Sequence, residues 1–253
     1  MFDSHCHLDF PEFDADRDQV LANCRALGMR GIIVPAIQQS YWSRLLKLTD
    51  SEAMLYPALG LHPMLIDQHH ESHLQDLNQL LSQQKAIAVG EIGLDYFLAQ
   101  LDKHKQQFFF VEQLRLAKRH QLPVILHVRK AHDEVLMQLR RAQLKGGIVH
   151  AFSGSEQQAY QYIDLGFKLG FGGALTYERA KKLRRLAASL PLESIVLETD
   201  APDMPLANQS GRRNSPENTV LICKKLAQLR ASDEAEIALK TQLNTTQIFS
   251  ISQ

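Results

Sequence analysis

The chain has 253 residues, of which 45% are hydrophobic, and this composition argues against a disordered or fibrous protein. Lysine and arginine together number 28, as do aspartate and glutamate, so the formal net charge is zero. A protein that holds nucleic acid by bulk basic charge alone is therefore not expected. A phosphate-bearing substrate remains open, provided that a few local groups or metal ions hold it.

Cysteine usage and the N-terminal segment indicate a reducing compartment. Cys6, Cys24 and Cys223 are widely spaced and form no CxxC pair, so we expect buried free thiols rather than disulfides or structural zinc. The N-terminus has neither the basic nor the apolar segment of a signal peptide. No window reaches the ~18 apolar residues of a membrane span. We expect a cytoplasmic protein without membrane association, and a monomer, because no seam forces a dimer.

Short apolar runs alternate with helical patterns along the whole chain. The expected strands are residues 1–7, 31–36, 56–61, 87–91, 124–127, 147–150, 167–171 and 195–199. The clearest helical patterns are residues 14–27, 104–120, 155–165, 177–190 and 233–248, with another helix starting at residues 215–216. Several strand runs are continuously apolar and β-branched, which is typical of parallel strands covered by helices.

Eight strand–helix repeats predict parallel βαβ units, arranged either as an open sheet or as a closed barrel. An open sheet often binds its ligand through a glycine-rich first turn, and no GxGxxG motif follows the first expected strand. Polar residues stand instead at the C-terminal ends of many strands, which is typical of a barrel. We therefore predict a single α/β domain over residues 1–253, a (β/α)8 TIM barrel.

Four histidines and two carboxylates end these strands, and a barrel would bring them to one mouth. Residues two apart on a strand point to the same face, so a pair of imidazoles on the first strand can share a metal. A carboxylate after a buried run is costly unless it is paired, protonated or coordinated. Each residue alone has an ordinary interpretation as a core histidine or a helix cap, but the set predicts a metal site. Its members are His5, His7, Glu91, His127, His150 and Asp200.

Six ligands exceed the four of one tetrahedral ion, so we expect two divalent ions, bridged by Glu91 and about 3.5–4 Å apart. The ligand mixture favours Zn²⁺ or Mn²⁺. Mg²⁺ prefers oxygen ligands, yet its abundance keeps it open. His62, at the end of the third strand, is expected to contact substrate. The other histidines are expected at the surface: His69, His70, His73, His104, His120 and His132.

Three further features offer phosphate contacts. Ser153 precedes an expected helix start, whose free N–H groups favour an anion. Arg129 either leans over the mouth to pair with phosphate or is a solvated loop charge. The basic run of residues 181–185 either forms the phosphate site common after the seventh barrel strand or is a solvated helix face. Aromatic residues near the ligand motifs either stack a base or lie in the barrel wall; they are Tyr96, Phe97 and Phe152.

Five short runs carry a family resemblance: residues 4–9 (SHCHLD), 60–63 (GLHP), 90–95 (GEIGLD), 150–154 (HAFSG) and 198–202 (ETDAP). In order and spacing they resemble the motifs of the TatD-like metal-dependent deoxyribonucleases, which belong to the wider amidohydrolase-like barrels. The resemblance covers nearly the whole chain and implies a two-metal barrel. It implies one metal on His5, His7, Glu91 and Asp200, and the other on Glu91, His127 and His150.

The resemblance also implies hydrolysis of nucleic acid, since many members are 3′→5′ exonucleases on DNA and some act on RNA. We expect a metal-activated water to attack a phosphodiester, with Asp200 and Glu91 as the catalytic residues and Asp200 taking the proton of the water. The alternative is a hydrolase of a small ester, an amide or aminoacyl-tRNA, because some relatives are linked to such substrates. Ala151 and Val128 depart from the residues commonest in the family, but neither is an expected ligand.

Overall fold

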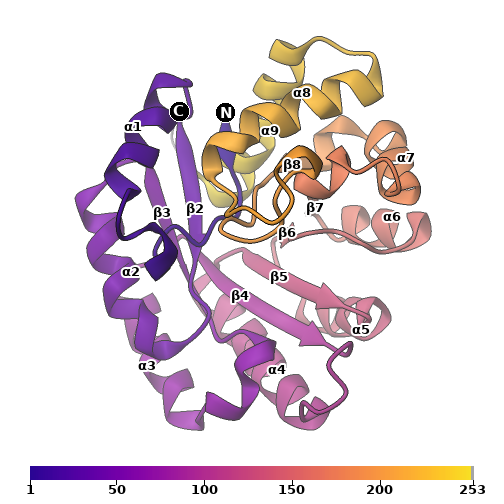
Figure 1. Cartoon of the computed structure of the whole chain (residues 1–253). Helices are drawn as coiled ribbons and strands as arrows, with labels where there is room; N and C mark the ends of the chain where they lie inside the picture. Colours follow the sequence, from indigo (N-terminus) through magenta and orange to yellow (C-terminus); the bar gives the residue numbers. More distant parts are fainter. Residues whose placement is uncertain (252–253) are drawn as a thin grey trace.

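Eight parallel strands follow one another in chain order around one sheet in the computed structural model, which describes residues 1–251. Each strand pairs with its neighbours in sequence (Figure 1). The strands are β1 (Phe2–Asp3), β2 (Gly31–Pro35), β3 (Leu55–Leu59), β4 (Ala88–Asp95), β5 (Val124–Arg129), β6 (Gly147–Val149), β7 (Phe167–Phe171) and β8 (Ile195–Leu197). The sheet confirms the predicted TIM-barrel architecture.

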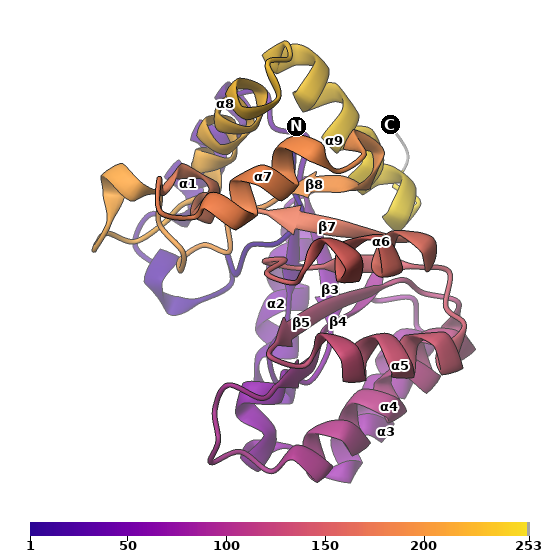
Figure 2. The same cartoon turned by 90° about the vertical axis from the view of Figure 1, so that its right-hand side faces the viewer.

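A helix follows each strand along the chain, with two after β8, and the helices cover the outside of the sheet (Figure 2). They are α1 (Arg17–Ala26), α2 (Gln39–Ser51), α3 (Glu71–Ser82), α4 (Lys103–His120), α5 (His132–Ala142), α6 (Glu156–Asp164), α7 (Lys181–Ser189), α8 (Thr219–Arg230) and α9 (Glu234–Phe249). Within residues 1–251, no helix has the length and apolar character that crossing a bilayer requires. The three cysteines are buried and free, as predicted.

The two ends of the sheet meet beyond β1 and β8. The Ser4 N–H donates to the Leu197 carbonyl at 2.9 Å, and the Asp200 N–H donates to the His5 carbonyl, also at 2.9 Å. These bonds close the barrel without extending the regular ladder. They also place two of the expected metal ligands side by side at the mouth.

Differences from the predicted strand boundaries fall mainly at this mouth. The expected first strand, residues 1–7, keeps ladder pairing only over Phe2–Asp3, because the backbone beyond it bonds to the residues after β8. β4 and β5 run further than predicted, since they go on pairing as far as Asp95 and Arg129. The end of β4 therefore carries one more carboxylate than the predicted strand did.

Helix starts agree with the predictions where a capping residue marks them. The Ser155 side chain accepts the N–H of Gln158 and forms a capping box at α6, and Asp233 caps α9. The helix expected from residue 177 begins only at Lys181, because residues 177–180 form an irregular segment. Predicted helix boundaries are weakest where no cap is present.

Apolar side chains fill the barrel from inside, and a larger cluster joins the strands to the helices. Phe249 of α9 packs into the inner cluster. Alternation along β2 sends Ile33 inward and its neighbours Ile32 and Val34 outward. The remaining inner residues are Phe2, Ala58, Ala88, Ile125, Ile148 and Val196. Since these side chains fill the barrel, the polar residues are left to gather where the strands end.

Candidate metal centre

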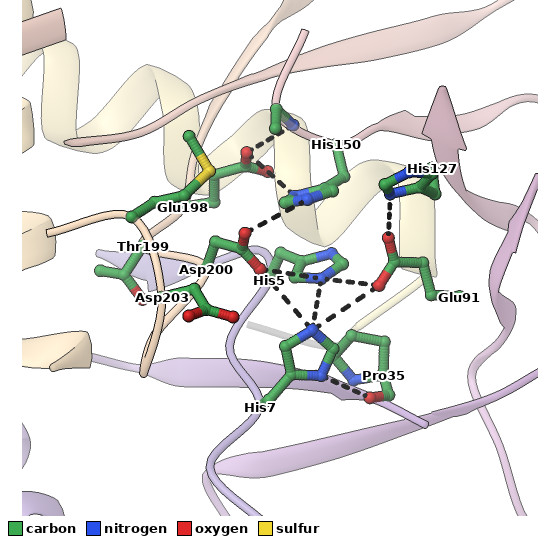
Figure 3. A network of polar contacts seen from close by, with 12 residues as sticks. His5, His7, Pro35, Glu91, His127, His150, Glu198, Thr199, Asp200 and Asp203 are labelled. Carbon is green, nitrogen blue, oxygen red and sulfur yellow. Dashed lines mark hydrogen bonds and ion pairs between the residues drawn. The ribbon is translucent and has the colours of Figure 1, made fainter. Parts of the chain in front are cut away.

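The six residues expected to bind metal converge on one space at the C-terminal ends of the strands (Figure 3). All are buried except His127 and Asp200, whose side chains are 16% and 17% exposed. The segment after β1 contributes His5 and His7, β4 contributes Glu91, β5 contributes His127, and the residues after β6 and β8 contribute His150 and Asp200.

Glu91 turns its two carboxylate oxygens toward two different groups of histidines. Its Oε2 lies 3.2 Å from Nε2 of His5 and 3.6 Å from Nε2 of His7. Its Oε1 lies 3.3 Å from Nδ1 of His127 and 3.2 Å from Nε2 of His62. The carboxylate therefore stands between two clusters of nitrogen atoms, which is the arrangement of a bridging ligand.

The two carboxylate oxygens of Asp200 also face different histidines. Its Oδ1 lies 3.6 Å from Nε2 of both His5 and His7, and its Oδ2 lies 3.6 Å from Nε2 of His150. The residue has a φ of 57°, a left-handed conformation that aspartate tolerates better than most side chains. This turn of the backbone follows β8 directly, at the point where the chain bonds to His5.

The hydrogen bonds of His7 show why a cation fits this space. Its Nδ1 lies 3.1 Å from the Pro35 carbonyl oxygen, which can only accept, so Nδ1 carries the proton. In the neutral ring, Nε2 then presents a lone pair to oxygens of Glu91 and Asp200. A lone pair and carboxylate oxygens repel one another unless a proton or a metal ion lies between them.

Two further histidines have the same arrangement. Asp95 Oδ2 lies 2.9 Å from Nε2 of His127, and Glu198 Oε1 lies 3.1 Å from Nδ1 of His150. Each ring therefore directs its other nitrogen into the centre. Nitrogen and oxygen atoms also approach one another within 4.8 Å in three groups, a spacing that suits metal ligands. The groups are His5–His7–Asp200, His5–Glu91–His150 and His62–Glu91–His127.

Burial and the neighbouring charges set the pKa values of the centre. Burial would raise the pKa of Glu91, but the surrounding histidines, led by His62 and His5, hold it well below its ordinary value. Burial raises the pKa of Asp200 to about 7. Burial lowers the pKa of His150, but Glu198 and Asp200 outweigh it and raise that pKa to about 10. A metal ion at His150 therefore competes with a proton.

Asp95 and Glu198 are two further carboxylates of the candidate site, and they were not predicted from the sequence. Both lie in runs already singled out there, four residues after Glu91 and two before Asp200. A carboxylate on the same strand as a ligand was the available signal. The distance from Asp95 to the ring of His127 became evident only once β4 and β5 were paired.

One prediction about the other histidines was wrong. His69, expected at the surface, is 1% exposed, because its Nε2 bonds to the His62 carbonyl at 2.9 Å and its ring packs near Phe109. It thereby supports the turn that carries His62. His132 is half-buried, with Nδ1 lying 3.2 Å from the Tyr162 hydroxyl.

The three expected substrate contacts lie in different settings. His62 is 7% exposed and faces Glu91, so it occupies a ligand position as well as the mouth. The exposed Arg129 guanidinium stacks over the ring of Phe97 at 3.7 Å, and that ring is itself 47% exposed. Ser153 is exposed, and its carbonyl accepts a hydrogen bond from Lys182. Arg129 and Phe97 together form a cationic and aromatic platform beside β5.

A TIM barrel with buried histidines and carboxylates at its C-terminal mouth defines the class of metal-dependent hydrolases. Comparison with protein families narrows this class. The family described as "TatD related DNase" matches residues 2–250, and the chain belongs to this TatD family.

Individual relatives agree with the family. The chain is 45% identical, over 98% of its length and 97% of the relative, to YjjV of Escherichia coli K12, described as an "uncharacterized metal-dependent hydrolase". The crystal structure of the E. coli K12 TatD homologue YjjV has a TM-score of 0.96 at 44% identity, covering 100% of this chain and 98% of that one. The "3'-5' ssDNA/RNA exonuclease TatD" of Salmonella typhimurium LT2 is 30% identical, over 99% of each chain.

Proposed function

We propose that this metal-dependent hydrolase cleaves phosphodiesters of nucleic acid and removes nucleotides from the 3′ end. DNA is the leading candidate substrate. The observation that carries the proposal is Glu91, whose two oxygens face two separate groups of histidines. A pair of metal ions a few ångströms apart suits in-line displacement at phosphorus. The relative named as a 3′→5′ exonuclease supports the choice of substrate.

The proposed ligand sets are those that the family resemblance implies. One ion would be held by His5, His7, Glu91 and Asp200, and the other by Glu91, His127 and His150, with Zn²⁺, Mn²⁺ or Mg²⁺ as candidate metals. His62 lies beside Glu91 Oε1 and completes the coordination of the second ion or orients the substrate. The bound ions would lower the pKa of a water and neutralise charge on phosphoryl oxygens.

Residues of the chain supply the remaining steps. Asp200 lies where both histidine groups meet, and we assign it the role of general base that accepts the proton of the attacking water. A general base typically raises the rate 10²- to 10⁴-fold. Glu91 positions the two halves of the centre relative to one another. Arg129 extends from the end of β5 over Phe97 and offers a paired contact to a phosphate next to the cleaved bond. Ser153, in the loop after the neighbouring strand β6, offers a further polar contact.

Single-stranded oligonucleotides labelled at either end test this proposal. Metal-stripped protein is resupplied with Mg²⁺, Mn²⁺ or Zn²⁺, with His127→Ala as the inactive variant and the exposed His104→Ala as its matched control. We expect a 3′ label to leave as a mononucleotide at once and a 5′ label to remain on a shrinking ladder. If His127→Ala abolishes both label patterns and His104→Ala keeps them, the cleavage takes place at the metal centre.

Absence of cleavage while the ions are bound would overturn the nuclease assignment. The same preparations would then be assayed with small esters, small amides and aminoacyl-tRNA. Release of a 5′ label first would overturn the direction of digestion but not the phosphodiester chemistry.

A further inference from the structure

A cavity of about 290 Å³ lies beside the metal centre, between the loop after β6 and the segment that joins β7 to α7. Figure 2 shows α6 and α7 on either side of β7, at this end of the barrel. The volume of the cavity is close to the lower end of the range for small-molecule sites, about 300–1,000 Å³. The cavity therefore has room for one compact group and not for a duplex.

The walls of the cavity combine apolar surface with positive charge. Apolar side chains line its inner part, and three cations stand at its rim: Arg179, Lys181 and Lys182. None of its lining residues is acidic. Within residues 1–251 none of the three cations forms an ion pair with a carboxylate. In a chain with no net charge, three unneutralised cations around one cavity indicate an anionic occupant.

The inner part of the cavity argues against a bare anion. Phe152 and Phe171 form part of the wall, with ring centroids 6.4 Å apart, and both are almost fully buried. The half-buried Leu183 and Met204 supply the apolar surface that a ligand can cover, and the buried rings and Leu186 lie behind it. A phosphate alone would leave Leu183 and Met204 in contact with water, and a neutral apolar ligand would leave the cations unused. A nucleotide has both a planar base and a phosphate.

One hydrogen bond and one ion-pair contact connect the cavity to the metal centre. Ala151, a lining residue, donates its N–H to Glu198 Oε1 at 2.6 Å, and the same oxygen lies 3.1 Å from His150. The cavity wall therefore adjoins the metal centre, so a group bound in the cavity would lie near the proposed cleavage site. The platform is formed by Arg129, at the end of β5, and Phe97, just after β4, and β6 separates it from β7.

From these observations we infer that the cavity is a nucleotide subsite, which takes the base of one substrate nucleotide against its apolar wall and that nucleotide's phosphate at Lys181 and Lys182. The inference rests on the proposed nuclease function and specifies which part of the substrate is held on the α7 side. The basic run at the start of α7 is then a binding element and not merely a solvated helix face.

Binding of thymidine 5′-monophosphate to the metal-loaded protein, followed by calorimetry, tests the inference. Thymidine and inorganic phosphate serve as separate probes of the two halves of the subsite. We expect the nucleotide to bind at least about tenfold more tightly than either probe, since both halves contribute. Phosphate binding as tight as that of the nucleotide would reduce the cavity to an anion site and overturn the inference.

Charge changes on α7 provide a matched comparison. Lys181→Ala/Lys182→Ala removes two charges at the rim, and Arg184→Ala/Arg185→Ala removes two charges from the same helix but outside the cavity. We expect the first variant to weaken nucleotide binding about tenfold or more and the second to change it less than about threefold. Equal effects in both variants would show a general field and overturn the subsite.

A third variant examines the apolar wall. Leu183→Asn should weaken binding of thymidine and the nucleotide while sparing inorganic phosphate, with thermal melting as the check on folding. Hydrolysis of bis(p-nitrophenyl) phosphate by the wild-type protein separates the two proposals, because this diester has no base. If the diester is not hydrolysed, the nuclease proposal fails; if it is hydrolysed but the nucleotide does not bind, only the subsite fails.

Discussion

Asp95 lies 2.9 Å from Nε2 of His127, whereas Glu198 lies 3.1 Å from Nδ1 of His150. The two carboxylates thus select opposite tautomers in rings that approach the centre from neighbouring strands. In each ring the remaining nitrogen presents its lone pair to the same central space. Residues that touch no substrate therefore decide which ring atoms can bind metal.

Replacing Asp95 by Asn tests this relationship. A neutral amide stabilises the ring N–H of His127 less well, so we expect metal affinity to fall about 10- to 100-fold while the fold persists. A chelating dye that competes for Mn²⁺ or Zn²⁺ measures the affinity. Asp67→Asn, on an exposed carboxylate, is the matched control. Wild-type affinity in Asp95→Asn would show that the tautomer of His127 is set by other groups.

Gly170→Ala should disturb the contact between Glu198 and His150 through packing. A Cβ at this position on β7 would overlap the Glu198 carboxylate, so the carboxylate must shift away from His150. We expect both lower stability and weaker metal binding. Urea unfolding of a double-mutant cycle with Glu198→Ala measures the coupling, since the smaller side chain removes the overlap. Additive losses in the cycle would mean that Gly170 serves some purpose unrelated to Glu198.

Arg129→Ala should raise the KM for an oligonucleotide about tenfold and affect kcat less, because the guanidinium is proposed to bind the phosphate next to the cleaved bond and not the reacting phosphate itself. Phe97→Ala should produce a smaller rise, because it removes only the ring that supports the guanidinium. Arg140→Ala, an exposed arginine on α5, is the control for lost charge. An equal rise in Arg129→Ala and Arg140→Ala would make the effect one of net charge.

His132 should make the protein less stable in mild acid. Burial, with Lys182 nearby, lowers the pKa of His132 to about 4, below its ordinary 6.5. Because the folded pKa is depressed, the unfolded chain binds the extra proton first. Stability is therefore complete above pH 6.5 and declines as the pH falls toward 4.

Urea unfolding at pH 7 and pH 5 measures this decline. We expect His132→Phe to lose about 1–2 kcal/mol less than the wild-type protein between these two pH values. Comparing the change with pH, rather than absolute stability, removes any packing difference caused by the substitution. Identical declines in the two proteins would assign the acid sensitivity to other groups.

The architecture and the gathering of six polar residues could be predicted because both follow from local pattern. Apolar runs mark strands, and parallel strands in a barrel bring their ends to one mouth. The partners of those residues could not be predicted, since Asp95 meets His127 only through the pairing of β4 with β5. Burial of His69 depends likewise on a turn whose path has no sequence pattern.

Titration of metal-stripped protein with Mn²⁺, with cleavage of a single-stranded oligonucleotide followed at each addition, tests the central claim most directly. The carboxylate of Glu91 faces two histidine groups, so activity should reach its maximum only when two equivalents are bound per chain. The Glu91→Gln variant should not reach this maximal activity at the Mn²⁺ concentrations that saturate the wild-type protein. Full activity at one equivalent, or without metal, would contradict a two-ion centre.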